Sequence, residues 1–298
     1  RWQYHDHVTQ RFVSAFPARC AAWCRDHGLL LTGHMLQEDT LFDQTCAVGE
    51  AMRCYRAFPL PGIDILCDAV HLGTAKQAQS AARQEGREGV LSELYGVTHW
   101  DFDFRGHKFQ GDWQAALGIP QRVPHLSWTS MEGEAKRDYP ASIHYQSPWY
   151  KEYGYIEDHF ARLNTVLTRG KLVVNIGVIH PIESYWLHGG PGDTGGARRQ
   201  VLEERFRDLT HWLLQGLVDF DFISEASLPD LGGVEAGTLR VGQMRYDVVL
   251  VPGCETLRRT TLERLEAFRA DVPDGQYALY LYLAELEGDP QRAPLAYN

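Results

Sequence analysis

Short apolar runs alternate with helical patterns through the first part of the chain. Between residues 6 and 27, apolar and aromatic positions recur at helical spacing, and Gly28 follows where a C-terminal cap belongs. Further helices are predicted over about 46–58 and 75–85. The apolar runs lie at residues 29–34, 62–66, 90–96 and 123–128. Strands and helices that alternate at this spacing predict βαβ units and a parallel sheet.

A second α/β pattern begins at Lys171, after a charged, aromatic loop and a predicted helix. The loop covers about 129–146, the helix 148–169, the later strands 172–179, 219–223 and 246–252, and the later helices about 199–215 and 260–268. Residues 272–283 form a turn and a β-prone run typical of antiparallel sandwiches. We therefore expect an α/β chain. Its parts are a partial TIM-type (β/α) barrel over 1–170, a partial flavodoxin-like (amidotransferase-like) α/β domain over 171–270, and a short sandwich-like β segment over 271–298.

Composition narrows the classes of partner. With 298 residues and 44% hydrophobic content, the chain can bury a sizeable core. Its net charge of -10 argues against a nucleic-acid partner, and no apolar run approaches the ~20 residues that span a bilayer. The six cysteines are scattered without CxxC pairs, which is typical of reduced thiols in a core. They favour the cytoplasm and leave a periplasmic or secreted location open.

Two carboxyl groups stand out beside these strand ends. Glu93 follows the apolar start of the third run, and the run closes in a turn at Gly96, which is how a barrel strand places a catalytic acid at its C-terminal rim. Glu38 lies shortly after the first run and is the second candidate. Glycoside hydrolysis uses two carboxyl groups, about 5 to 5.5 Å apart for retention and wider for inversion. The alternative interpretation of Glu93 is a rim glutamate in a salt bridge.

His34 and Asp64 are predicted to bind or position the substrate. His34 and Glu38 could instead ligate zinc from a helix, but Gly33 favours a strand-end loop and no third ligand is spaced to match. Asp64 could instead cap the following helix. We predict no metal and no cofactor.

Aromatic residues near the same strand ends suit a sugar. Sugars present hydroxyls at their edges and C–H surfaces on their faces, so their sites combine carboxylates with aromatic platforms. Trp100, His125 and Trp128 are the candidates for substrate binding, with a place in the core as the alternative for each tryptophan. Asp101 and Asp103 offer two oxygen ligands for calcium, which is too few to define a site.

The second pattern carries two weaker signals. The glycine-rich stretch at 189–196 fits neither a dinucleotide-binding nor a phosphate-loop motif and is interpreted as a plain loop. Cys254 follows a strand, where a glutamine amidotransferase carries its nucleophile. No His-x-Glu on a helix follows it, so Cys254 is interpreted as structural.

Several segments together resemble bacterial glycoside hydrolases related to the family 42 β-galactosidases and the family 106 α-L-rhamnosidases. They are residues 32–38, 61–64, 90–93, 125–128 with 136–140, and 179–184. The resemblance covers about residues 1–270 and implies a TIM barrel followed by an amidotransferase-like domain without amidotransferase activity. It also implies that the four runs are barrel strands five to eight, and that Glu93 matches the nucleophile at the end of strand seven.

The resemblance implies hydrolysis of a terminal glycosidic bond, with one departure. In these enzymes the acid/base glutamate follows strand four, and residues 1–27 resemble the helix after that strand, so we expect a truncated chain with little activity by itself. The run after Val272 resembles the sandwich domain appended to family 2 β-galactosidases. A non-catalytic carbohydrate-binding or assembly subunit is the alternative function. Open strand edges in half a barrel leave homo-oligomer formation open.

Overall fold

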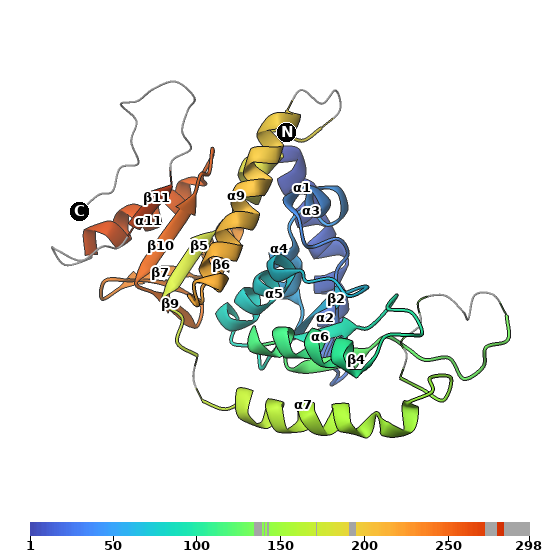
Figure 1. Cartoon of the computed structure of the whole chain (residues 1–298). Helices are drawn as coiled ribbons and strands as arrows, with labels where there is room; N and C mark the ends of the chain where they lie inside the picture. The colour runs from blue at the N-terminus through green and yellow to red at the C-terminus, as the bar shows by residue number, and fades with distance from the viewer. Residues whose placement is uncertain are drawn as a thin grey trace.

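Two parallel sheets with surrounding helices organise the chain (Figure 1). The structure is a computed structural model that describes residues 1–133, 139, 141, 143–170, 172–190 and 195–271, and the backbone of 279–282. The predicted α/β class, with parallel sheets, is confirmed.

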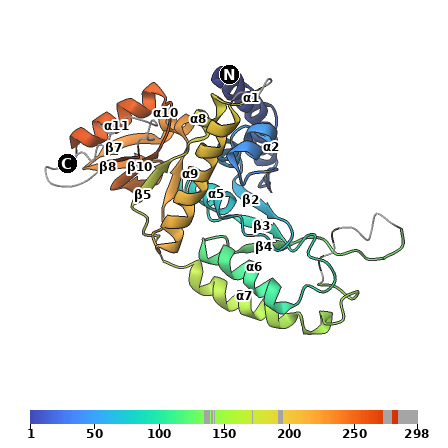
Figure 2. The ribbon, with the colours of Figure 1, turned by 45° about the horizontal axis from the view of Figure 1, so that its top comes forward.

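The first sheet contains four parallel strands in sequential order, β1-β2-β3-β4. Its strands are β1 (Thr32–Gly33), β2 (Leu60–Ile65), β3 (Leu91–Leu94) and β4 (Gln121–Pro124). Its helices are α1 (Trp2–Ala15), α2 (Pro17–Asp26), α3 (Leu41–Ala47), α4 (Ala51–Ala57), α5 (Leu72–Gln84), α6 (Phe104–Ala116), η2 (Tyr150–Glu152) and α7 (Gly154–Leu167). Figure 2 shows α6 and α7 side by side, beyond β4. Neighbouring parallel strands in chain order are the arrangement found in a TIM-type barrel.

Two predicted helices are each divided in the structure. The helix expected over 6–27 ends at Ala15, and α2 begins at Pro17, because proline has no backbone N–H to continue the ladder. The helix expected over 46–58 is replaced by α3 and α4, which are separated at Gly49. Gly49 has φ +81°, and a Cβ there would lie 1.8 Å from the Thr9 hydroxyl oxygen. The close packing of α1 therefore requires glycine at this break.

The strands are shorter than predicted, and one helix was missed. β1 keeps only two residues of the run at 29–34, and β4 ends at Pro124, so His125 and Trp128 lie beyond it. Helix α6 begins after Asp103, whose carboxylate accepts hydrogen bonds from the backbone N–H groups of Arg105 and Gly106. Asp103 is thus an N-cap residue, which accounts for it without calcium.

The second sheet has the order β11-β10-β5-β6, all parallel, and a separate antiparallel sheet β7-β8-β9 was not predicted. The elements are β5 (Ile176–Ile179), α8 (Ile182–Trp186), α9 (Gly196–Gln215), β6 (Asp221–Ile223), η3 (Glu225–Ser227), α10 (Leu228–Leu231), β7 (Gly232–Glu235), β8 (Thr238–Val241), β9 (Met244–Tyr246), β10 (Val248–Pro252), α11 (Arg259–Asp271) and β11 (Leu279–Tyr282). The run predicted as sandwich-like supplies β11, which pairs in parallel with β10. Its neighbours at 272–278 and 283–298 lie outside the described residues, so the predicted domain boundaries stay predictions.

Helix α5 lies between the two sheets and contacts both β2 and β6 (Figure 1). Its two basic side chains Lys76 and Arg83 are buried and paired: Lys76 Nζ lies 2.7 Å from Asp219 Oδ1, and Arg83 Nη1 lies 2.9 Å from Asp221 Oδ1. A continuous hydrophobic core joins Ile63 of β2 to Phe222 of β6. The two units therefore share one core, and the position of the first sheet depends on the second unit.

Candidate functional site

Three predicted site residues meet at the carboxyl ends of β1, β2 and β3. Asp64 and Glu93 are register partners on neighbouring strands, so their side chains project from the same face of the sheet. His34 follows β1, and its Nε2 lies 3.2 Å from Glu93 Oε2. His34 and Glu93 have side chains that are about one-third exposed, at 31% and 32%. The sheet thus brings a histidine and two carboxyl groups to one accessible edge.

The loop after β1 is fixed by hydrogen bonds at both ends. His34 Nδ1 lies 2.8 Å from the Met35 carbonyl oxygen, and the Met35 backbone N–H donates to Glu38 Oε1 at 2.8 Å. The Gln77 side chain of α5 donates to the Glu38 carbonyl oxygen at 3.0 Å. Glu38 itself is only 3% exposed. The predicted second carboxyl group is therefore buried, and its hydrogen bond to Met35 fixes the conformation of the loop that carries His34.

The charged groups at this edge shift one another's pKa values. Burial by itself would lower the pKa of His34, but the Met35 carbonyl and the carboxylates of Asp64, Glu93 and Glu38 together raise it. Burial raises the pKa of Asp64, and the nearby Glu93 adds to this, against the opposing effect of His34. Burial also raises the pKa of Glu38, to about 7. The site therefore contains groups that exchange protons near neutral pH.

Backbone strain is concentrated at the same strand ends. Five non-glycine residues after β1, β2 and β3 have φ between 56° and 74°: Gln37, Cys67, Tyr95, Val97 and His99. For a β-branched residue such as Val97 this conformation is a true outlier, and such strain costs about 1–3 kcal/mol per residue. Strain of this kind clusters at functional sites. Residue patterns in the sequence carry no signal for it.

His125 joins the cluster, whereas the tryptophans form a pair of their own. The backbone N–H of His125 donates to the Leu94 carbonyl at 2.8 Å, and its charge acts on Asp64. The rings of Trp100 and Trp128 have centroids 6.0 Å apart at an interplanar angle of 50°. The predicted tryptophans are therefore adjacent and half-buried. The role of Glu38 as the second catalytic carboxyl group stays a prediction, and its burial argues against direct contact with a substrate.

Within the described ranges, no group of three or more His, Cys, Asp or Glu residues is arranged to hold a metal ion. No helix in those ranges has the length and apolar character needed to cross a membrane.

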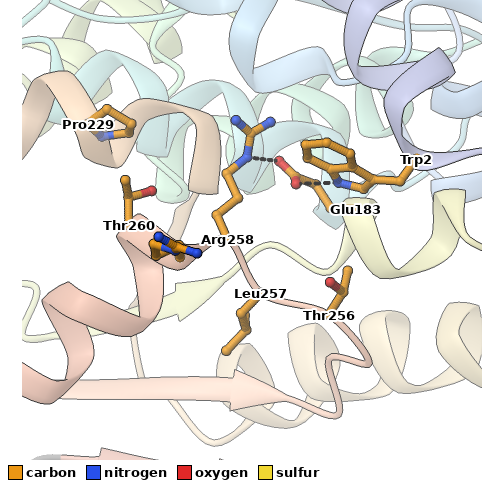
Figure 3. A pocket seen from close by; sticks show the side chains of 8 residues that line it. Trp2, Glu183, Pro229, Thr256, Leu257, Arg258 and Thr260 are labelled. Carbon is orange, nitrogen blue, oxygen red and sulfur yellow. Dashed lines mark hydrogen bonds and ion pairs between the residues drawn. The ribbon is translucent and has the colours of Figure 1, made fainter.

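A hollow of about 450 Å³ lies away from this edge, where α1, α8 and the start of α11 meet (Figure 3). Its polar groups bind one another: Trp2 Nε1 donates to Glu183 at 2.7 Å, and Arg258 Nε donates to the same carboxylate at 2.8 Å. Nearby, burial raises the pKa of the Cys254 thiol, with Glu225 contributing. A thiol of this kind stays protonated and is a poor nucleophile, which agrees with the structural interpretation of Cys254.

The fold of this chain resembles that of solved glycoside hydrolases. No protein-family profile matches the chain, and no curated protein matches it in sequence. The solved structures that resemble it include a rhamnosidase from Novosphingobium sp. PP1Y, with a TM-score of 0.67 and 16% identity over 89% of this chain and 25% of that one. They also include Gan42B, a GH42 β-galactosidase from G. stearothermophilus, with a TM-score of 0.61 and 12% identity over 94% and 41% of the two chains. A β-galactosidase from Rahnella sp. R3 has a TM-score of 0.53 and 14% identity over 82% and 35%.

The chain has a glycoside hydrolase-like fold. It spans between a quarter and about two-fifths of the length of these proteins. At such low identity the likeness concerns the fold, and any activity must be argued from the site.

Proposed function

We propose that this chain supplies part of the active site of a glycoside hydrolase that cleaves a terminal glycosidic bond, with Glu93 as the nucleophile or base. The observation that carries the proposal is the meeting of Glu93, Asp64 and His34 at the carboxyl edge of a parallel sheet. Glu93 is accessible, and Asp64 stands beside it to orient a sugar hydroxyl. The rhamnosidase and β-galactosidase likeness supports a terminal neutral sugar as the substrate class.

Glu38 is proposed as a supporting carboxyl group. Its burial keeps it from touching a sugar, but a pKa of about 7 suits a group that stores a proton at neutral pH. In the proposed chemistry, Glu93 reacts with the sugar, and the protonatable side chains of Glu38 and His34 support it.

The test is hydrolysis of aryl β-galactosides and aryl α-L-rhamnosides by the wild type and by Glu93→Gln. The substitution keeps the shape and removes the charge, so turnover should fall by roughly a thousandfold or more. Glu88→Gln is the matched control, since Glu88 is an exposed glutamate outside the site. Measurable turnover by the wild type that Glu93→Gln leaves unchanged would refute the role of Glu93.

A non-catalytic carbohydrate-binding role is the second candidate, and the Trp100–Trp128 ring pair favours it. This role predicts retention on a sugar polymer without hydrolysis of any aryl glycoside. Trp128→Ala should then weaken retention, whereas Glu93→Gln should leave it intact.

A further inference from the structure

Both ring nitrogens of His34 face hydrogen-bond acceptors. Nδ1 lies 2.8 Å from the Met35 carbonyl oxygen, which only accepts, so Nδ1 must carry a proton. Nε2 lies 3.2 Å from a Glu93 carboxyl oxygen. A neutral ring with its proton on Nδ1 would turn a lone pair toward that carboxylate. The contact is attractive only when a proton lies between Nε2 and Glu93.

The charges around the ring decide where that proton resides. Three carboxyl groups act on His34: Asp64 from β2, Glu93 from β3, and Glu38 from its own loop. All three favour a positive ring over a neutral one. Two further histidines, His71 and His125, act on Asp64 and so belong to the same electrostatic cluster.

Glu38 sets the orientation of the ring through the backbone. Its carboxyl oxygen holds the Met35 N–H at 2.8 Å, and Met35 is itself buried. The Met35 carbonyl in turn holds Nδ1 of His34. A chain of contacts therefore runs from Glu38 through Met35 and His34 to Glu93.

We propose that His34 is a positioning residue which, as a doubly protonated imidazolium anchored through Met35 by Glu38, holds the Glu93 carboxylate in one orientation. The inference rests on the proposed function for its catalytic meaning, since Glu93 is the reacting group there. Its consequence is that loss of the His34 proton at high pH releases Glu93, so His34 sets the alkaline limb of activity.

The deciding measurement needs no turnover. The ¹⁵N signals of His34 are recorded in the full chain over a pH series and assigned by their loss in His34→Asn. We expect both nitrogens to be protonated at neutral pH. Glu93→Gln should lower the titration midpoint by about one pH unit, because an opposite charge within about 4–6 Å shifts a pKa by this much or more. Glu38→Gln should lower it too, and Glu88→Gln should leave it unchanged.

A neutral His34 at about pH 7, or a midpoint that Glu93→Gln does not move, overturns the inference. If aryl glycosides are hydrolysed, the alkaline limb of kcat/KM should shift to lower pH in Glu38→Gln, whereas a purely structural role would leave its position unchanged. The inference and the proposed function fail separately. A doubly protonated His34 together with hydrolysis that survives Glu93→Gln refutes only the proposed function. Hydrolysis that depends on Glu93 beside a neutral His34 refutes only the inference.

Discussion

Replacing Glu38 by Gln should stabilise the protein at alkaline pH and leave it nearly unchanged at acid pH. Burial raises the pKa of Glu38 from its ordinary 4.5 to about 7. The unfolded chain releases this proton near its ordinary pKa, whereas the folded chain keeps it until about pH 7. The contribution of protonated Glu38 to the free energy of unfolding is therefore fully present below its ordinary pKa. It is lost as pH rises toward the pKa that Glu38 has in the folded chain. Since one pKa unit is worth about 1.4 kcal/mol, the loss is about 3 kcal/mol.

Glutamine has the same shape, keeps an acceptor for the Met35 N–H and does not titrate, so it avoids this loss. Urea unfolding at about pH 5 and about pH 8.5 measures the difference, and the advantage of Glu38→Gln should grow by about 2.5 kcal/mol between them, because part of the loss has already occurred at pH 5. Glu88→Gln, at an exposed position, should show little change at either pH. A stability difference that is the same at both values would refute the assignment of Glu38 as a buried, protonatable group.

The alternation of strands and helices was visible in the sequence because each strand is a short apolar run closed by a polar residue. Glu93, Asp64 and His34 could be placed at one edge on this basis, since the carboxyl ends of parallel strands lie together. Their pairing could not be predicted. It depends on the register of β2 with β3 and on the rotation of the His34 ring, and no single segment encodes either.

Glu38 and helix α5 show why burial was the harder property to predict. Glu38 follows the exposed Leu36 and Gln37, and only the return of its side chain to Met35 buries it. Helix α5 has a stripe of alanines on one face and polar residues over the rest of its surface, a pattern typical of a helix with one solvated face. It is buried because a sheet lies on each side. Its basic residues Lys76 and Arg83 bind carboxylates about 140 residues later in the chain.

Two stability predictions concern residues that hold the sheets in place. Gly62→Ala should cost about 1–3 kcal/mol in urea unfolding, because its Cβ would lie 2.7 Å from a backbone oxygen of β1; unchanged stability would contradict this packing. Arg53→Met should cost about 3–5 kcal/mol at neutral pH, because Arg53 is buried and binds Glu50 and Glu183, which would be left as buried, poorly compensated charges. The matched control is Arg105→Met, whose side chain is 94% exposed and should contribute at most about 1 kcal/mol. The loss at Arg53 should shrink as pH falls to about 4, because burial raises the pKa of Glu183 and its protonated carboxyl group no longer needs a cation. A loss that is independent of pH would show that Arg53 acts through the packing of its aliphatic stem rather than through its charge.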